Sequence, residues 1–509
     1  MESATASDPV LTPNEPGLKA NSLTFVDALA IGLNSTSPAY SLAAVLGPIV
    51  VLVGVNAPGV LIASFVPMLL IASAFNYLNK VDQDCGTTFS WVGRAMGPWM
   101  GWLGGWAIAM TGVLVVGSLA DVAVRFTLLM LGQNEMAENR YLVMAIAVLV
   151  IIFMTWICVI GTQATSKVQN VLVLAQIAGL LILVAVALAR AFTGSGTPGA
   201  PTPEWSWLNP FSQTPGALTG GLLLGVFAYW GWESAFNLSE ETKDSSRIPG
   251  LAGLASTVIL LITYVGTAIA VVAFLGPLVL VARADQQEMI FATVAGDALG
   301  GWKWIVLAAV AISALASTQT TIIPASRTAL SMARNQAIPS YFGKISAAHQ
   351  TPSVSTWWVA VIAIIWYVAV NFISTNALLD SVTALSMLIA FYYSLTGLAC
   401  AVYYRHLVLH NVRAFFLIGV GPVIGSIMLA ALLVLSGISM ANPANSETGE
   451  AWLGVGPPLV IGIGMFVVGI IFMVASRLSG SPFWFRKPCV VDPALVPLAD
   501  GGTRENHAT

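Results

Sequence analysis

Charged side chains are rare in this sequence. Asp, Glu, Lys and Arg make up 8% of the 509 residues, whereas soluble domains carry about 25%. Hydrophobic residues make up 57%. This composition excludes a typical soluble protein and indicates an all-α polytopic membrane protein, because helices satisfy their own backbone hydrogen bonds in lipid. The net charge of −3 gives no indication of a nucleic-acid partner.

Cysteine and histidine are also scarce, with four residues of each. The cysteines lack the paired spacing of a disulfide framework or zinc site, which favours structural, unpaired thiols at Cys85, Cys158, Cys400 and Cys489. The histidines all fall in expected inner loops or in the tail, at His349, His406, His410 and His507. A metal site or a buried histidine relay therefore has no support.

Signatures of ATP use and of catalysis are missing as well. The sequence contains no GxxxxGK[ST] motif, so transport driven directly by ATP is not predicted. No nucleophile, base and orienting acid occur together in the apolar segments, so an enzyme is not predicted. No cofactor is expected.

Twelve apolar segments have about 20 residues or more, which is the length that a helix needs to cross a bilayer. We therefore expect twelve spans, at about 24–54, 58–79, 98–131, 141–161, 168–192, 217–240, 251–276, 302–333, 355–373, 377–404, 413–437 and 452–476. An even number of crossings places both termini on one side. With that side inside, 15 of the 20 Lys and Arg lie in inner segments, so the positive-inside rule predicts cytoplasmic termini.

Three segments outside the spans are polar or rich in Gly and Pro. Residues 1–22 lack the pattern of a signal peptide and are expected to form a disordered cytoplasmic tail. Residues 193–216 are expected to form an extracytoplasmic loop between two halves of the bundle. Residues 477–509 are expected to form a cytoplasmic C-terminal tail, whose end, GGTRENHAT, is expected to be disordered.

The first span is interrupted by a polar run, Asn34 to Ser37, that ends at Pro38. Proline removes one backbone donor and disfavours helical geometry at the residue before it. In lipid such a break persists only where protein, water or a ligand satisfies the backbone. We therefore expect an unwound segment near 32–37. The alternative is a structural kink whose hydroxyls bond back to carbonyls one turn earlier.

A matching interruption lies in the sixth span, where Gly231 and Glu233 sit within an apolar segment. A carboxylate at that depth costs roughly 2.5 to 3.5 kcal/mol on insertion scales, so it needs polar surroundings. Five spans separate the two interruptions, and an odd number of crossings reverses direction. Units of spans 1–5 and 6–10 should therefore be inverted relative to each other, which is typical of a secondary transporter with a midplane site.

Two stretches carry a resemblance to a known family. FAYWGWESAFNLSEETKDSSRIPG at 227–250 and SRTALSMARNQAIPSYFGKISAAHQTPSVS at 326–355 resemble the sixth span and the exit of the eighth span in the amino acid/polyamine/organocation permeases. The resemblance covers roughly 23–476. It implies a LeuT-type fold of 5+5 inverted repeats plus two C-terminal helices, with the first repeat at 23–192, the second at 217–404 and the last two spans within 405–476.

The resemblance also implies where the substrate would bind. A free amino acid would lie between spans 1 and 6, its carboxylate at backbone donors of the first break and its ammonium at unpaired carbonyls of both. The residues concerned are Ile31, Gly32, Ser35, Thr36, Ser37, Ala39, Phe227, Ala228, Tyr229 and Gly231. Phe227 would be an aromatic gate over the substrate; its alternative role is ordinary packing.

Two departures from the family pattern bear on this site. The first break has Asn34-Ser35-Thr36-Ser37-Pro38 in place of a small-residue triplet, and the fifth span has Gln176 where many proton-coupled members have a lysine. A lysine-based proton switch is therefore not supported, although H+ remains favoured over Na+ as a coupling ion. Ser317 and Thr318 could line the former sodium-site region.

Glu233 has three candidate roles: it could hold the hinge by accepting backbone hydrogen bonds, carry a proton, or pair with a cation. We favour the hinge. Asp121 and Arg125, four residues apart, are expected to form a local ion pair. An inner gate of exchanging ion pairs is expected from Glu240, Glu241, Lys243, Arg247, Arg327 and Arg334, unless these residues serve only as interfacial anchors.

The predicted function is secondary active transport of amino acids across a plasma membrane, with the substrate and membrane lipid as partners. The absence of an Asn-x-Ser/Thr acceptor in the outer loops fits a bacterial cell membrane. A carrier of polyamines or cationic amino acids is the alternative, although it would need more buried carboxylates than Glu233 and Asp121 provide. A nutrient sensor that does not transport is a second alternative, against which the short tails argue.

Overall fold

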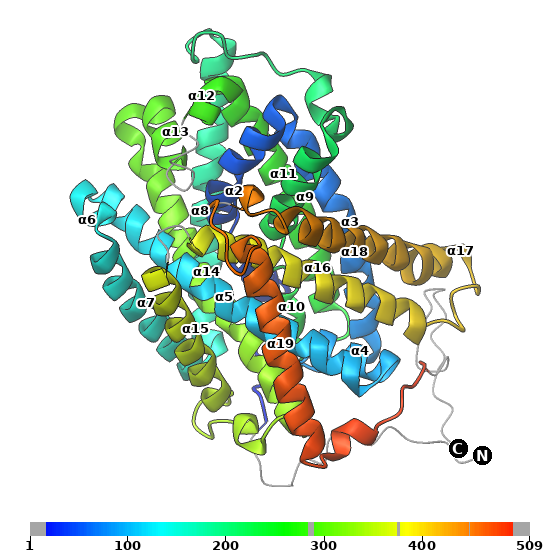
Figure 1. Cartoon of the computed structure of the whole chain (residues 1–509). Coiled ribbons are helices and arrows are strands. Elements are labelled where there is room, and N and C mark those ends of the chain that lie inside the picture. The colour runs from blue at the N-terminus through cyan, green and yellow to red at the C-terminus, as the bar shows by residue number, and fades with distance from the viewer. Residues whose placement is uncertain (1–16, 283–289, 374–376, 447, 492–509) are drawn as a thin grey trace.

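The computed structural model describes residues 17–282, 290–373, 377–446 and 448–491. Within these ranges the chain is helical, apart from two isolated β-bridges, so the all-α prediction is confirmed. The helices pack into one bundle with long, mostly upright elements (Figure 1). The α-helices are α1 Phe25–Thr36, α2 Pro38–Val53, α3 Ala57–Val81, α4 Thr88–Met96, α5 Pro98–Met130, α6 Asn134–Glu138, α7 Arg140–Ile160, α8 Thr162–Phe192, α9 Pro215–Ala228, α10 Ser234–Asn237, α11 Ile248–Leu275, α12 Pro277–Ala282, α13 Ile290–Leu299, α14 Trp304–Arg334, α15 Ser353–Ile373, α16 Ala377–Tyr403, α17 Val412–Ala414, α18 Gly421–Met440 and α19 Pro457–Leu478.

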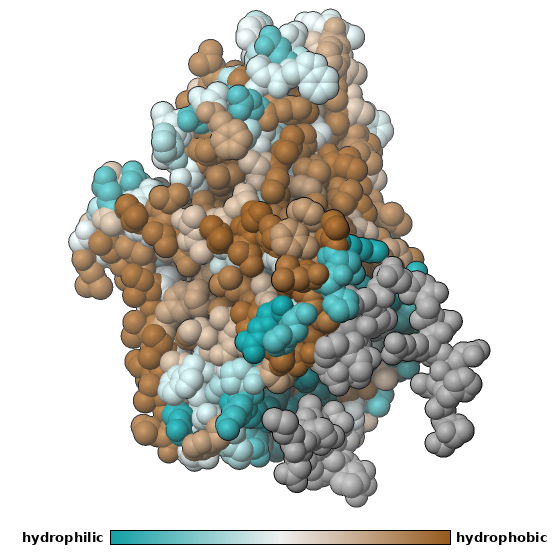
Figure 2. All heavy atoms as spheres, turned by 90° about the vertical axis from the view of Figure 1, so that its right-hand side faces the viewer, coloured by the Kyte–Doolittle hydropathy of each residue, from teal (hydrophilic) through white to brown (hydrophobic). Residues whose placement is uncertain are grey.

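Ten helical segments of the described chain are long and apolar enough to cross a membrane. They include one run of 57 residues, Phe25–Val81, that contains α1, α2 and α3. On the face turned toward the viewer in Figure 2, hydrophobic residues cover much of the surface, with hydrophilic ones at both ends and in a patch at mid-height. The chain is therefore an integral membrane protein.

The centre of the bundle is α5. In its most apolar stretch, 94% of the residues are buried. Two of its glycines permit close neighbours. A Cβ atom on Gly112 would lie 3.0 Å from the Cβ of Ala325 on α14, and one on Gly117 would lie 2.6 Å from the ring of Tyr367 on α15. Small residues at such crossings let membrane helices pack backbone to backbone.

The first span breaks between α1 and α2, but over a shorter stretch than expected. Ser37 alone has a left-handed backbone (φ 56°), and Pro38 begins α2 at a position where proline needs no N–H donor. Residues 32–36 remain helical, so the predicted unwinding over 32–37 is wrong except at its last residue. The Thr36 hydroxyl donates to the carbonyl of Gly32 at 2.9 Å. This is the alternative in which hydroxyls of the polar run bond back to carbonyls one turn earlier.

The sixth span breaks at the expected place. Helix α9 ends at Ala228, residues 229–233 form turns, and the chain resumes as α10 and the 3₁₀ helix η4 Ser239–Glu241. Gly231 has φ +122°, a conformation that residues with a Cβ rarely adopt. Consequently a glycine is needed where this span turns.

The described parts of the two tails are attached to the bundle. Ser22 and Leu23 donate backbone hydrogen bonds to the carbonyl of Glu241 at 2.8 and 3.1 Å. At the other end, η10 Pro482–Phe485 follows α19, and Phe483 and Trp484 are buried. The aromatic side chains thus attach the start of the C-terminal tail to the bundle. Residues 1–16 and 492–509, which include the expected disordered end GGTRENHAT, lie outside the described residues.

Candidate functional site

The two helix breaks lie against each other. A Cβ atom on Gly231 would lie 2.6 Å from the carbonyl carbon of Ser35 and 2.7 Å from the nitrogen of Thr36. A Cβ atom on Gly32 would lie 3.2 Å from the carbonyl oxygen of Trp232. Glycine on each side thus allows the two backbones to meet directly.

The structure brings the predicted substrate-binding residues together at this junction, and all of them are buried: Ile31, Gly32, Ser35, Thr36, Ser37, Ala39, Phe227, Ala228, Tyr229 and Gly231. Some of their carbonyls already accept side-chain donors. Ser317 donates to the carbonyl of Ser35 at 3.0 Å, and Tyr264 donates to that of Ala228 at 2.7 Å. Each carbonyl has a second lone pair for another donor.

Aromatic side chains surround the second break. The ring of Phe227 on α9 lies edge-on to Tyr40 of α2, with 6.4 Å between centroids, so it links the helices that adjoin the two breaks. Tyr229 lies between Phe65 of α3 and Tyr264 of α11, at 5.9 and 5.0 Å. The Tyr229 hydroxyl has no hydrogen-bond partner within the described residues.

Glu233 is enclosed by hydrogen-bond donors. Its carboxylate accepts the backbone N–H of Gly231 at 3.0 Å and the phenol hydroxyls of Tyr392 and Tyr393 from α16. The indole of Trp230 donates in turn to the Tyr392 hydroxyl. The carboxylate therefore holds the turn around Gly231 and ties it to α16, and only 4% of the residue is exposed.

A network of buried amides and hydroxyls joins the first break to α8 and α14. Asn34 donates to the side-chain carbonyl of Gln169 at 2.6 Å and accepts a hydrogen bond from Gln176. Gln169 donates to Gln319 at 2.6 Å. Ser313 donates to Gln176 and lies 2.8 Å from the Ser37 hydroxyl. The network is electrically neutral, and each of these amides has at least one partner.

Sequence reasoning identified part of this environment. Gln176 and Ser317 lie in it, whereas Thr318 bonds back to Ala314 within its own helix. Tyr392, Tyr393, Gln169, Ser313 and Gln319 were missed. The sequence contained a signal for them, because Gln residues and a Tyr-Tyr pair are unusual in apolar runs. However, their hydrogen-bond partners lie more than 130 residues away in the chain.

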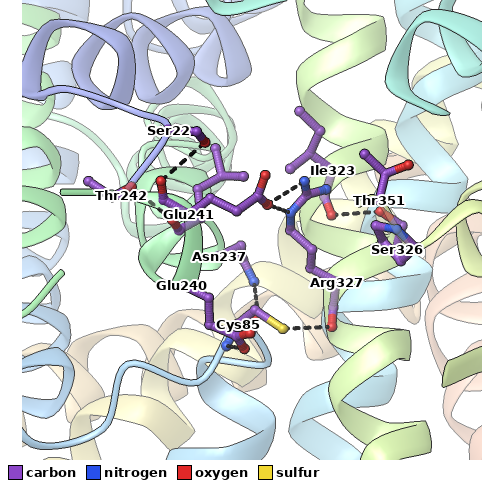
Figure 3. Close-up of polar contacts among 12 residues, drawn as sticks. Ser22, Cys85, Asn237, Glu240, Glu241, Thr242, Ile323, Ser326, Arg327 and Thr351 are labelled. Carbon is purple, nitrogen blue, oxygen red and sulfur yellow. Dashed lines mark hydrogen bonds and ion pairs between the residues drawn. The ribbon is translucent and has the colours of Figure 1, made fainter. Parts of the chain in front are cut away.

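Ion pairs join α14 to the segment after α10, and Figure 3 shows one of them. Arg327 of α14 donates to a single oxygen of Glu241 at 2.7 and 2.5 Å, and the two side chains are only 3% and 0% exposed. Arg334 donates to both oxygens of Glu240 at 3.0 and 2.9 Å. Four of the predicted gate residues thus form two ion pairs between α14 and the segment after α10.

The other predicted gate residues have different surroundings. Lys243 is exposed and its backbone N–H donates to Leu23. Neither Lys243 nor Arg247 forms a side-chain ion pair with the described part of the chain. Further out, Asp121 pairs with Arg125 as expected, and also accepts the Tyr367 hydroxyl at 2.6 Å.

Asp84, Cys85 and Glu240 bring potential metal ligands within 4.8 Å of one another. However, both oxygens of Glu240 accept hydrogen bonds from Arg334, and one also accepts the backbone N–H of Cys85 at 3.1 Å. Burial raises the pKa of the Glu240 carboxyl, but the charge and hydrogen bonds of Arg334 together with the hydrogen bonds of Cys85 lower it overall. The carboxylate is therefore engaged as the anion of an ion pair.

Asp82, just after α3, should make stability depend on pH. Burial raises its pKa to about 7, although Arg94 at 3.1 Å opposes the shift. Folding therefore disfavours the ionised form of Asp82. The resulting loss of folding stability is absent when the pH is below the ordinary pKa near 3.8, and it is complete when the pH is above about 7. We expect Asp82→Asn to raise the melting temperature relative to wild type more at pH 8 than at pH 5. Thermal unfolding in detergent would measure this, and a difference independent of pH would contradict the assignment.

Long apolar helices, two breaks in contact and a buried carboxylate at one of them define a polytopic membrane protein of the transporter type. The family model described as amino acid permease matches residues 23–466. The chain therefore belongs to the amino acid permease family, within the superfamily that its motifs resembled. Members of this family are transporters and not enzymes.

Individual relatives share low sequence identity with this chain. An uncharacterized transporter of Mycobacterium tuberculosis is 28% identical over 65% of this chain and 70% of its own length. The human Asc-type amino acid transporter 1 is 24% identical over 81% of this chain and 73% of its length. The vacuolar cationic amino acid transporter 4 of Arabidopsis thaliana is 25% identical over 74% and 62%, respectively.

Proposed function

We propose that this protein is a secondary active transporter that moves amino acids across the plasma membrane by alternating access. The observation that carries the proposal is the contact between the two breaks, where Gly231 meets the backbone of Ser35 and Thr36. Interrupted spans that meet at membrane depth give backbone groups from both helices access to one substrate. The named amino acid transporters among the relatives support the same substrate class.

The proposed architecture is a LeuT-type bundle of twelve spans in two inverted repeats, 23–192 and 217–404, followed by two further spans. The run Phe25–Val81 is long enough for two crossings, and α9 with α10 would form the sixth as two short halves. Both termini would be cytoplasmic, in a membrane of bacterial type. This would place the loop at 193–216 outside.

Within this scheme, the start of α2 would receive the substrate carboxylate and the carbonyls near Phe227 to Tyr229 its ammonium. Glu233 would act as the hinge, because its oxygens are occupied by Gly231, Tyr392 and Tyr393. The pairs Arg327–Glu241 and Arg334–Glu240 would form the inner gate. Neutral amino acids are the favoured substrates, since the carboxylate of Glu233 is already engaged by three donors.

Uptake into proteoliposomes tests the proposal. We expect a labelled neutral amino acid to enter saturably, and we expect Glu233→Gln to lower the rate by about tenfold, because hydrogen bonds to a charged group contribute roughly 1.5 to 3 kcal/mol. Glu135→Gln, at an exposed position, is the matched control and should transport as wild type does. Uptake would be measured with and without an inward proton gradient, and with and without substrate inside.

The alternatives give different results in the same assay. Accumulation that requires the gradient would identify a proton-coupled permease, whereas uptake that requires internal substrate would identify an exchanger. Saturable uptake of putrescine alone would replace the amino acid assignment with a polyamine carrier. If a folded preparation transports none of these compounds, the protein is not a transporter of this class and a sensor becomes the better assignment.

A further inference from the structure

The segment 479–491, here called the C-terminal strap, runs along the ends of several helices. Its backbone donates from Cys489 to the carbonyl of Arg94 at 2.7 Å and from Val491 to that of Tyr403 at 3.1 Å. Ser481 donates its hydroxyl to the carbonyl of Gln336. In Figure 1 the strap is the red segment that leaves α19 and passes toward α4. It therefore spans the ends of α4, α14 and α16.

Aromatic contacts fix the depth of the strap in the membrane. Phe483 stacks on Phe89 with 5.5 Å between ring centroids, and Trp484 lies 5.0 Å from Trp99 and 5.6 Å from Trp102. Trp99 is the second residue of α5, which is a candidate span, and α19 ends one residue before the strap begins. The strap thus lies at the level where spans end, in the interfacial zone that tryptophan favours.

The strap and the adjoining end of α19 carry exposed apolar and cationic side chains. Phe485 is 64% exposed and the adjoining Leu478 is 81% exposed. Arg486 and Lys487 are also exposed, and the guanidinium of Arg477 lies 4.5 Å above the ring of Phe485. Residues 476–491 contain no Asp or Glu. The strap and the end of α19 therefore carry three cations and two exposed apolar side chains, without an acidic residue among them.

Arg486 forms no ion pair with a carboxylate of the described residues. Its guanidinium donates to the side-chain carbonyl of Asn335, which is neutral, and lies 5.9 Å from the ring of Phe483. Burial and the neighbouring Arg94 lower the pKa of Arg486, whereas Asp84 opposes this only as a smaller contribution. Such a cation is stabilised by an anion from outside the chain.

We propose that the C-terminal strap is a docking surface for anionic phospholipid headgroups. Phe485 and Leu478 would enter the acyl boundary, while Arg477, Arg486 and Lys487 would meet the phosphates. Basic residues at an anionic membrane surface contribute about 1 kcal/mol each, and interfacial aromatic rings add apolar area. Because the strap bonds to the ends of α4, α14 and α16, bound lipid would also brace these ends. The proposal requires only that the protein is in a membrane and is independent of its substrate.

Cys489 allows a direct test, because it lies in the strap and is exposed, whereas Cys85, Cys158 and Cys400 are buried. The full chain would be labelled at Cys489 with a fluorophore, with Cys489→Ser as the labelling control, and placed in phosphatidylcholine vesicles. A small fraction of headgroup spin-labelled phosphatidylglycerol or phosphatidylcholine would then quench the label. We expect stronger quenching by phosphatidylglycerol, and a preference that falls by about fivefold for each charge removed in Arg486→Gln/Lys487→Gln.

The control removes two exposed cations elsewhere, in Lys344→Gln/Arg405→Gln, and should keep the preference of wild type. Equal quenching by both lipids would overturn the proposal, and so would an equal loss in the control. If the strap variant does not fold, two measurements still decide. The charge-retaining Arg486→Lys/Lys487→Arg should keep the preference, and added salt should reduce it in wild type; failure of either result would overturn the proposal.

Discussion

Replacing Arg327 with methionine should destabilise the protein by about 3 to 5 kcal/mol, which is the usual cost of removing one partner from a buried ion pair. The Glu241 carboxylate that this cation faces is 0% exposed. The double variant Arg327→Met/Glu241→Gln removes both charges and should recover most of the loss. Arg405→Met, at an exposed position just after α16, should have little effect. Thermal unfolding in detergent would rank the four proteins.

The same variants test whether the pair closes the inner end of the site. Cys85 is 0% exposed, and its thiol lies 3.5 Å from the carbonyl of Arg327. In a Cys489→Ser background, alkylation of Cys85 should be several times faster in Arg327→Met than in the parent. Unchanged alkylation together with a lower melting temperature would assign the pair to stability alone. That result would remove Arg327 and Glu241 from the proposed gate.

Much of the bundle could be predicted from the sequence because the bilayer imposes a length on each apolar segment. The expected span at 355–373, for example, differs from α15 by two residues at its start. The predicted unwound stretch at 32–37 was too long, and the reason is physical. Asn34 and Ser35 are polar but remain helical, since their polar groups reach partners on α8 and α14. A polar run in a span therefore marks a contact as readily as a break.

The partners of the buried polar groups could not be predicted. Glu233 was recognised as a group that needs donors, but two of these come from Tyr392 and Tyr393, about 160 residues later. The pairing depends on how α16 packs against the second break, which hydropathy does not encode. By contrast, the Phe-Trp-Phe run at 483–485 was a readable signal for an attached tail. The polar composition of the residues around it concealed that signal.

Gly231 should be the least tolerant position of the candidate site. Alanine there would have to adopt φ +122°, and its Cβ would lie 2.6 Å from the backbone of Ser35. The strained backbone costs of the order of 1 to 3 kcal/mol, and no flexible side chain can move to relieve the contact. We expect Gly231→Ala to separate the two breaks, to lower the melting temperature and to reduce amino acid uptake by about tenfold or more.

Gly266 provides the matched control for this prediction. It lies within α11, and a Cβ there would meet no atom within 4 Å. Alanine favours a helix over glycine by about 1 kcal/mol, so Gly266→Ala should leave uptake unchanged and stability equal or slightly higher. Uptake and unfolding of both variants would be measured in the same lipid. Full transport by Gly231→Ala would mean that the contact between the breaks is dispensable, and would remove the observation on which the proposed substrate site rests.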